Sequence, residues 1–328
     1  MGWWQVNADT LARGRFVVSP LAETTASLLA LERATAAHPG ERAWLDTHLA
    51  AYQARRAEDP LVPQLVKEAM ARHWIPGFIT LAPTGDREPE FADELAKVTG
   101  MSDEAAAAEL TPVMAGSPYA SDVTTPGLPQ RAADLLDWVW THTVVPYWPR
   151  RRRIIEADIV ARTTKLGQGG WAAALADMRP GLRWLGEGRL QINALGNPPR
   201  KISGAELFFV PVTPHAGWVA WDEPRRYAVM YPCSGTLALP DSQAAAPETL
   251  AALLGPARAA ILALLDTPKT TTQLVTLTGQ GLGSVGRHLK VLWDAGLLHR
   301  RRAGRSVLYY RSEAGDLLVS LQNDSTRP

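Results

Sequence analysis

The chain has 328 residues, of which 46% are hydrophobic, and its charge is nearly balanced, with 34 Lys and Arg against 33 Asp and Glu. That length favours two domains with apolar cores. A single cysteine, Cys233, excludes a disulfide framework and a thiolate metal cluster. Because no run of about 18 apolar residues occurs, we expect no membrane partner and a cytoplasmic protein.

The first 185 residues predict mainly helices, after a short strand near residues 4–6. Ser19 and Pro20 form a helix start, because serine caps helices and proline suits the first helical position. Further helices are predicted at 41–57, 61–74, 89–98, 103–110, 129–148 and 150–178. The run Arg150 to Arg153 begins the last of these. Four consecutive residues point around the helix axis, so a solvated or salt-bridged face is favoured there over a second DNA-binding surface.

From residue 185 the pattern changes to short β-type runs. Gly186-Glu187-Gly188 predicts a hairpin turn, and strands are expected at 205–212, 217–222 and 226–232. A linker rich in Pro, Ala and small polar residues precedes residue 246. The sequence therefore predicts an α+β, mainly α, chain in three segments. These are an α-rich sensor or dimerisation region at 1–185, a small β-sheet with a linker at 186–245, and a C-terminal module at 246–328.

The C-terminal module concentrates the positive charge. It has ten Lys and Arg against six Asp and Glu, a net +4, which leaves −3 for the rest of the chain. Such clustering is typical of a nucleic-acid-binding module. Within it, Val285, Leu289 and Leu292 share one face of a predicted helix that ends at Ala295-Gly296. A predicted hairpin follows, with arginine at its turn, so the element order favours a winged helix-turn-helix.

At these residues the module, over roughly 247–315, resembles the ArsR-type winged-helix transcriptional regulators. The resemblance lies in Arg287-His288-Leu289 with Leu292, in Ala295-Gly296-Leu297, and in Arg302-Ala303-Gly304-Arg305 with Tyr309-Tyr310. The long helical region before the module is similar to that of the larger two-domain actinobacterial members. Their N-terminal region is poorly characterised, so this part of the resemblance implies no particular ligand.

The chain departs from the family pattern in two ways. Gly281, Gly283 and Gly286 crowd the start of the recognition helix, which fits either close approach of its backbone to phosphate or tolerance in a helix held by packing. The family's metal sites lack their ligands, since 270–279 has no Cys and 313–324 has no His. We expect neither a metal nor another cofactor.

The resemblance implies double-stranded operator DNA as a partner and a homodimer that spans two half-sites. Arg287 and His288 are expected to contact bases or phosphates, and Lys290 to contact phosphate or solvent. Arg302 and Arg305 flank the hairpin turn and are favoured over their neighbours. The predicted DNA contacts are Ser284, Arg287, His288, Lys290, Arg300, Arg302 and Arg305.

Eleven of the twelve tryptophans precede residue 222. Trp138, Trp140, Tyr147 and Trp148 lie close together in sequence, and they either belong to the core or line a ligand pocket. The expected function is a DNA-binding repressor that a small molecule releases. An alternative is a DNA-binding regulator whose N-terminal region docks a partner protein and senses no metabolite. An enzyme fused to a DNA-binding module is less favoured, because no phosphate loop or nucleophile elbow is present.

Overall fold

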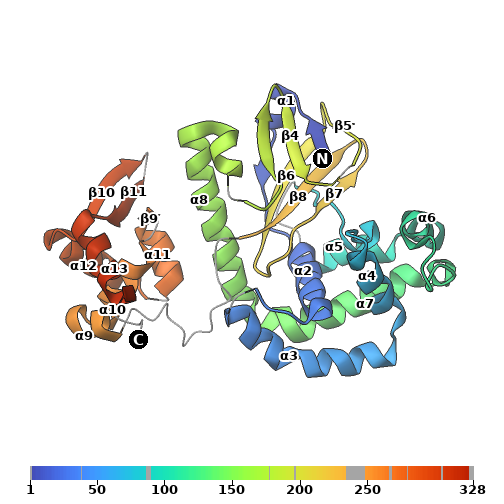
Figure 1. The fold of residues 1–328 in the computed structure, drawn as a ribbon, viewed down its shortest axis with the longest axis horizontal. Coiled ribbons are helices and arrows are strands. Elements are labelled where there is room, and N and C mark those ends of the chain that lie inside the picture. The colour runs from blue at the N-terminus through green and yellow to red at the C-terminus, as the bar shows by residue number, and fades with distance from the viewer. Residues whose placement is uncertain are drawn as a thin grey trace. The chain divides into compact units, whose positions relative to one another are not determined.

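The computed structural model describes residues 2–37, 39–85, 90–176, 178–195, 197–233, 248–265, 268–278, 280–303 and 306–324. The chain divides into two compact units, Met1–Leu237 and Ala238–Pro328 (Figure 1). The boundary between them falls within 234–247, outside the described residues, where the sequence predicts a linker. The fold is α+β and mainly helical, as the sequence predicts. No helix in the described ranges is long and apolar enough to cross a membrane.

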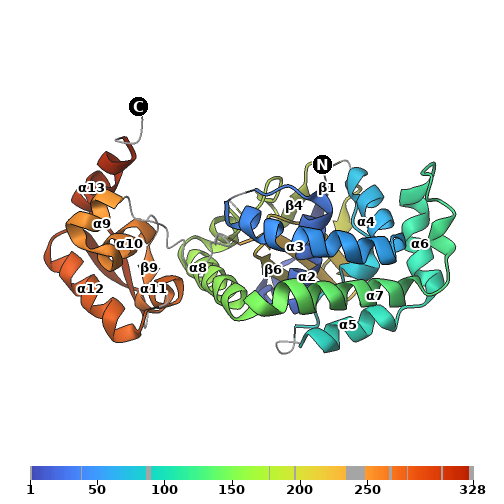
Figure 2. The same ribbon diagram turned by 90° about the horizontal axis from the view of Figure 1, so that it is seen from below.

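Unit 1 is organised around helix α2 (Pro20–Arg33), in which nearly every residue is buried. Ser19 caps this helix, since its side chain accepts a hydrogen bond from the Ala22 N–H, as the sequence predicts. Helix α2 contacts α3, α4, α5 and α7, and Figure 2 shows α3 and α7 running beside it. The other helices of unit 1 are α1 (Ala8–Ala12), α3 (Pro39–Glu58), α4 (Leu61–Ala71), α5 (Phe91–Thr99), α6 (Asp103–Met114), α7 (Leu128–Val139) and α8 (Trp148–Leu175).

Two four-stranded sheets complete unit 1. The first has the order β3-β4-β1-β5 and the second has the order β2-β6-β8-β7. Strands β3 and β4 form the hairpin that the sequence predicts through Gly186-Glu187-Gly188. The strands are β1 (Gly2–Gln5), β2 (Arg15–Phe16), β3 (Arg183–Gly186), β4 (Arg189–Asn193), β5 (Arg200–Lys201), β6 (Glu206–Val212), β7 (Val219–Asp222) and β8 (Arg226–Pro232).

The second sheet is buried on both faces. Successive side chains of a strand point to opposite faces, so β6 sends Phe208 and Val210 into the helical core and Leu207 and Phe209 to the other side. There they pack with β1, β4 and the end of α8. Since β1 and β2 pair with strands more than 180 residues away, the described parts of the predicted segments 1–185 and 186–245, which end at residue 233, fold together as one unit.

Two predicted helices of unit 1 differ in detail. The segment expected as one helix at 129–148 is α7, then a π-helical segment (Trp140–Val144), then a 3-10 turn (Val145–Tyr147) before α8. Pro146 accounts for the break, because proline has no N–H and clashes with the preceding turn. Helix α8 departs from helical backbone angles at Gly169 and Gly170. Proline and glycine therefore interrupt two segments that hydrophobic spacing alone predicts as continuous helices.

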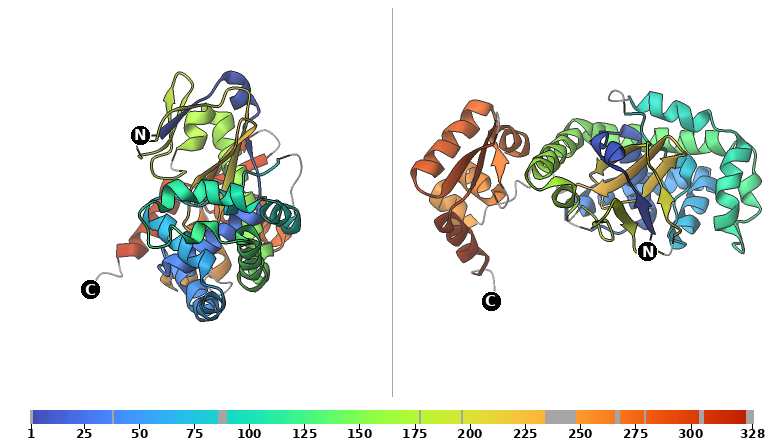
Figure 3. Two further views of the ribbon diagram at one scale, coloured as in Figure 1. Left: turned by 90° about the vertical axis from the view of Figure 1, so that its right-hand side faces the viewer. Right: turned by 90° about the horizontal axis from the view of Figure 1, so that it is seen from above.

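Unit 2 combines helices with one small sheet of order β10-β11-β9. Helices α10, α11 and α12 contact one another, and β10 packs beside α12 (Figure 3). Gly296, with a φ of 74°, follows α12 in the left-handed conformation that ends helices. The elements are α9 (Glu248–Leu254), α10 (Pro256–Leu264), β9 (Lys269–Thr270), α11 (Thr271–Thr278), α12 (Leu282–Asp294), β10 (Leu298–Ala303), β11 (Ser306–Arg311) and α13 (Glu313–Asp324).

Candidate functional site

Helix α12 in unit 2 has one buried face and one exposed face. Val285, Leu289 and Leu292 are at most 1% exposed and join the core of α10 and α11, which confirms the predicted anchoring face. Arg287 and Lys290 are exposed on the opposite side. The helix is therefore fixed by packing while its polar side chains face outward.

The polar side chains of α12 are partly organised by local contacts. Ser284 Oγ donates to Gln280 Oε1 at 3.1 Å and lies 3.3 Å from His288 Nε2. Arg287 Nε donates to the Gly283 carbonyl at 3.3 Å, while the rest of the guanidinium extends from the helix. Lys290 Nζ pairs with Asp294 Oδ2 at 2.7 Å. Of the two cations, Arg287 has no carboxylate partner in the described structure, whereas Lys290 has one.

The antiparallel hairpin β10–β11 carries the arginines that follow α12. Arg300 lies opposite Tyr309, and Arg302 lies opposite Val307, so both point to one face of the hairpin, and Arg301 points to the other. The Arg300 guanidinium stacks 3.9 Å from the centre of the Trp293 ring at the end of α12. Arg305 lies outside the described residues. The hairpin thus presents Arg302 as an exposed cation beside the exposed helix.

Unit 1 contains a cavity of about 870 Å³. Its walls come from the end of α2, the segment after α4, helix α6, the first sheet and the edge strand β7. Four tryptophans from three separate parts of the sequence line it, namely Trp4, Trp74, Trp218 and Trp221. The cavity therefore depends on both sheets and on the helical layer together.

Arg179 and Glu109 are partly buried ionisable groups of the cavity wall. Arg179 donates from Nη2 to the Ile192 carbonyl at 2.8 Å and from Nη1 to the Met230 carbonyl at 3.3 Å. Desolvation lowers the pKa of Arg179 to about 10. Burial raises the pKa of Glu109, although the N–H groups of Phe78 and Gly77 favour its ionised form. The wall thus carries a desolvated cation and a carboxyl group that protonates more readily than usual.

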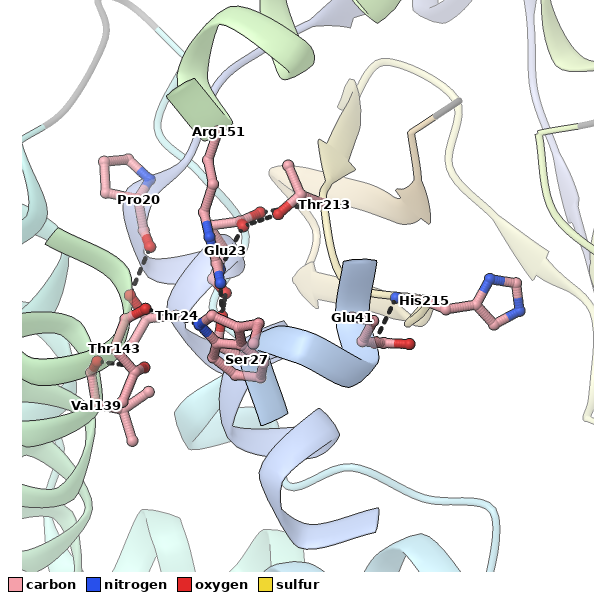
Figure 4. A network of polar contacts seen from close by, with 11 residues as sticks. Pro20, Glu23, Thr24, Ser27, Glu41, Val139, Thr143, Arg151, Thr213 and His215 are labelled. Atoms are coloured by element: carbon pink, nitrogen blue, oxygen red, sulfur yellow. Dashed lines mark hydrogen bonds and ion pairs between the residues drawn. The ribbon is translucent and has the colours of Figure 1, made fainter. Parts of the chain in front are cut away.

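A buried polar network holds the loop that leads into the cavity wall (Figure 4). Glu23 of α2 accepts hydrogen bonds from the Thr213 N–H, at 2.8 Å, and from the Thr213 hydroxyl. Arg151 of α8 donates to Glu23 and to Ser27. Glu41 of α3 accepts from the His215 N–H at 3.2 Å. These bonds fix both ends of 213–215, immediately before the lining residues 216–222.

The four aromatics for which the sequence suggests ligand contacts lie elsewhere in unit 1, and none lines this cavity. Trp140 stacks on Phe91 at 4.6 Å and meets Trp148 edge-on, while Trp138 stacks on His142. Tyr147 packs against His48. All four are partly buried and pack against the helical core. The four aromatics lie within eleven residues of one another, whereas the cavity tryptophans come from three separate parts of the sequence.

The prediction of a solvated or salt-bridged face at Arg150 to Arg153 is correct only in part, because the run also places one arginine in the core, where it pairs with Glu23. Arg151 is fully buried, and Arg152 pairs with Glu156 at 2.8 Å. Within the described residues, no group of three or more His, Cys, Asp and Glu is arranged to hold a metal ion. Comparison of the chain with known proteins found no matching family model, no similar curated protein and no similar solved structure.

Proposed function

We propose that the chain is a sequence-specific DNA-binding transcriptional regulator whose unit 2 is a winged helix-turn-helix module. The observation that carries the proposal is the pairing of two exposed basic elements on one core. Helix α12 is anchored by three buried residues and extends Arg287 outward, and the neighbouring hairpin extends Arg302. Exposed arginines on adjacent, rigidly packed elements suit simultaneous contact with a groove and its phosphates.

In the proposed complex, α12 enters the major groove. A helix with its side chains is about 10 to 12 Å wide, which matches a major groove of about 12 Å. Arg287 reaches a base edge, preferably guanine, whose O6 and N7 accept a bidentate guanidinium. Ser284 and His288 contact bases or phosphates from the first turns of the same helix, and Lys290 contacts the backbone. The hairpin carries Arg300, Arg302 and Arg305 along the adjacent phosphates.

The cavity of unit 1 supports a sensing role. Ligand sites are typically concave and lined by aromatic side chains with a few polar groups, which describes this cavity. We propose a homodimer that represses transcription and releases DNA when a small molecule occupies unit 1. Ligand binding and DNA binding are then coupled reciprocally. If unit 1 docks a protein partner instead, DNA binding remains and the response to small molecules is absent.

The proposal is tested by selecting bound sequences from a random duplex library with the full-length protein. We expect near-palindromic sites whose half-sites lie about one helical turn apart. Arg287→Ala should cost about 1 to 3 kcal/mol on the selected site and relax preference at one base pair in each half-site. Arg189→Gln is the matched control, since Arg189 is an exposed arginine of unit 1 paired with Glu187. Absence of any enriched sequence, or equal losses of Arg287→Ala on selected and random DNA, contradicts sequence-specific reading by α12.

A further inference from the structure

We propose that the cavity of unit 1 binds a planar aromatic carboxylate, held between tryptophan side chains and anchored through the guanidinium of Arg179. The inference rests on the proposed function in one respect, because it names the chemical class of the molecule that the regulator senses. The binding event itself involves unit 1 alone.

The first support comes from hydrogen-bond donors in the cavity wall. The indole N–H groups of Trp4, Trp74 and Trp218 are buried and have no acceptor among the described residues. Trp4 is fully buried and Trp218 is 6% exposed, so neither indole has ready access to bulk solvent. Buried donors are normally paired, and an unpaired one costs about 1 to 3 kcal/mol. Three such donors border one cavity, and a ligand that displaces the atoms covering them would pair them with its acceptor atoms.

The second support is Arg179. A guanidinium has five N–H donors, and Arg179 uses two of them for backbone carbonyls. It forms no ion pair with a carboxylate in the described structure, so its charge is compensated only by carbonyl dipoles. A Cβ placed at Gly217 would lie 3.4 Å from Arg179 Cδ and 3.1 Å from the Met230 carbonyl, which shows how closely the loop approaches this side chain. An arriving carboxylate would supply the missing negative charge in a bidentate arrangement.

The other charges around the cavity do not offset Arg179. Arg200 pairs with Glu223 and stacks on Trp221, and Arg226 pairs with Glu206 and Asp222, so these groups are largely neutralised. Glu109 is the other carboxyl group of the wall, and burial raises its pKa, which weakens its ability to compensate the charge of Arg179. The uncompensated charge in the cavity wall is therefore positive and favours binding of an anion.

The shape of the ligand follows from the walls and the volume. About 870 Å³ lies within the usual range of roughly 300 to 1,000 Å³ for small-molecule sites. The rings of Trp74 and Trp221 meet edge-on at 6.2 Å, and Trp4 and Trp218 line the same space. Aromatic walls stabilise flat aromatic ligands through stacked and edge-on contacts. A ligand of several fused rings with one carboxylate satisfies both the walls and Arg179.

The test uses pyrenebutyrate as a fluorescent aromatic carboxylate and pyrenebutanol as its neutral counterpart. Binding to the full-length protein is followed by energy transfer from tryptophan to pyrene, without DNA. We expect pyrenebutyrate to bind at least about tenfold more tightly, because a hydrogen-bonded ion pair contributes at least that factor. Arg179→Gln should abolish the preference and leave pyrenebutanol binding unchanged, and Arg179→Lys should keep part of it. Arg189→Gln should bind both probes like the parent protein.

A second variant addresses the indole donors. Trp218→Phe keeps an aromatic wall and removes one N–H, so pyrenebutyrate affinity should fall severalfold, whereas Trp184→Phe, outside the lining, should have no effect. Equal affinity of the parent protein for the two probes, or no binding of either, overturns the proposal without any variant. Retention of the preference in a folded Arg179→Gln protein overturns the role of Arg179. None of these results affects the DNA selection experiment, and failure of that experiment leaves the probe measurements valid.

Discussion

Arg151 and Glu23 form an ion pair in the core of unit 1, with Arg151 Nη1 2.8 Å from Glu23 Oε1 and both side chains fully buried. The pair joins α8 to α2, and Glu23 also binds Thr213 at the loop after β6. The Arg151 guanidinium lies 4.9 Å from the centre of the Trp44 ring, which provides a further partner for the charge. Three elements that are distant in sequence thus meet at one buried charge pair.

Removal of one member of this pair should destabilise unit 1 severely. Arg151→Met leaves the Glu23 carboxylate buried without its cation, and breaking a buried pair typically costs about 3 to 5 kcal/mol. The double variant Glu23→Gln with Arg151→Met should recover part of that loss. Urea unfolding of the full-length protein measures both. Arg152→Gln is the control, because its half-exposed pair with Glu156 contributes about 1 kcal/mol or less. Similar losses of unfolding free energy for Arg151→Met and Arg152→Gln would show that burial does not increase the contribution of the Arg151–Glu23 pair to stability.

Glu94 should make the stability of unit 1 depend on pH. Burial raises its pKa from 4.5 to about 7, despite hydrogen bonds from the Leu21 N–H and the Ser19 hydroxyl. The folded state therefore binds the proton more tightly, so the contribution of Glu94 to stability falls as pH rises from 4.5 to 7. The total effect is on the order of 3 kcal/mol. Glu94→Gln should flatten this part of the profile in urea unfolding between pH 4.5 and 8. Parallel profiles for the two proteins would exclude Glu94 as the titrating group.

Gly286→Ala should stabilise unit 2. A Cβ at Gly286 meets nothing within 4 Å, and alanine in a helix is favoured over glycine by about 0.5 to 1 kcal/mol. The melting temperature of unit 2 in the full-length protein measures the gain. Gly283→Ala, also in open space on the first turn, is the companion variant. DNA affinity, measured on the same proteins, separates the two reasons for these glycines. A loss of DNA affinity indicates that the helix backbone approaches DNA closely at these glycines. Unchanged affinity indicates that the glycines are simply tolerated in a helix held by packing.

The hairpin should contribute a nonspecific, salt-dependent part of DNA affinity. Arg302→Ala should weaken binding to selected and random DNA alike and reduce the slope of log K against log salt by about 0.9 for one lost phosphate contact. Arg301→Ala, on the other face of β10, should change the slope less. Titrations at several salt concentrations give both slopes. Identical slopes for the parent protein and Arg302→Ala would remove this residue from the interface.

Trp140→Ala should unfold unit 1 rather than alter ligand binding. Trp140 stacks on Phe91 and contacts Trp148, and truncation of a packed aromatic side chain typically costs about 3 to 5 kcal/mol. The fraction that remains folded should bind pyrenebutyrate with unchanged affinity. Thermal unfolding, combined with the probe titration, measures the two effects. A stable Trp140→Ala protein with selectively impaired ligand binding would contradict this expectation and would indicate that the aromatic cluster at 138–148 contacts the ligand.

Local signals were sufficient for much of the fold. The Ser19 cap, the turn at 186–188 and the anchoring face of Val285, Leu289 and Leu292 each depend on residues close in sequence, and each was predicted. The cavity was not, because it brings together residues as distant in the chain as Trp4 and Trp218, which belong to no common local pattern. No spacing rule marks such a site in advance. The DNA contacts stay predictions, since their partner is a different molecule.

The pairing of β1 with β4 also bears on the order in which the protein can fold during synthesis. Trp4 lies opposite Leu190, and β2 pairs with β6. A nascent chain leaves the ribosome from its N-terminus, so β1 and β2 emerge long before their partner strands β4 and β6 have been synthesised. Contacts of such long sequence separation also slow folding. The chain start is thus among the last segments to dock, and a chain interrupted before residue 190 exposes two unpaired strands that invite association with other chains.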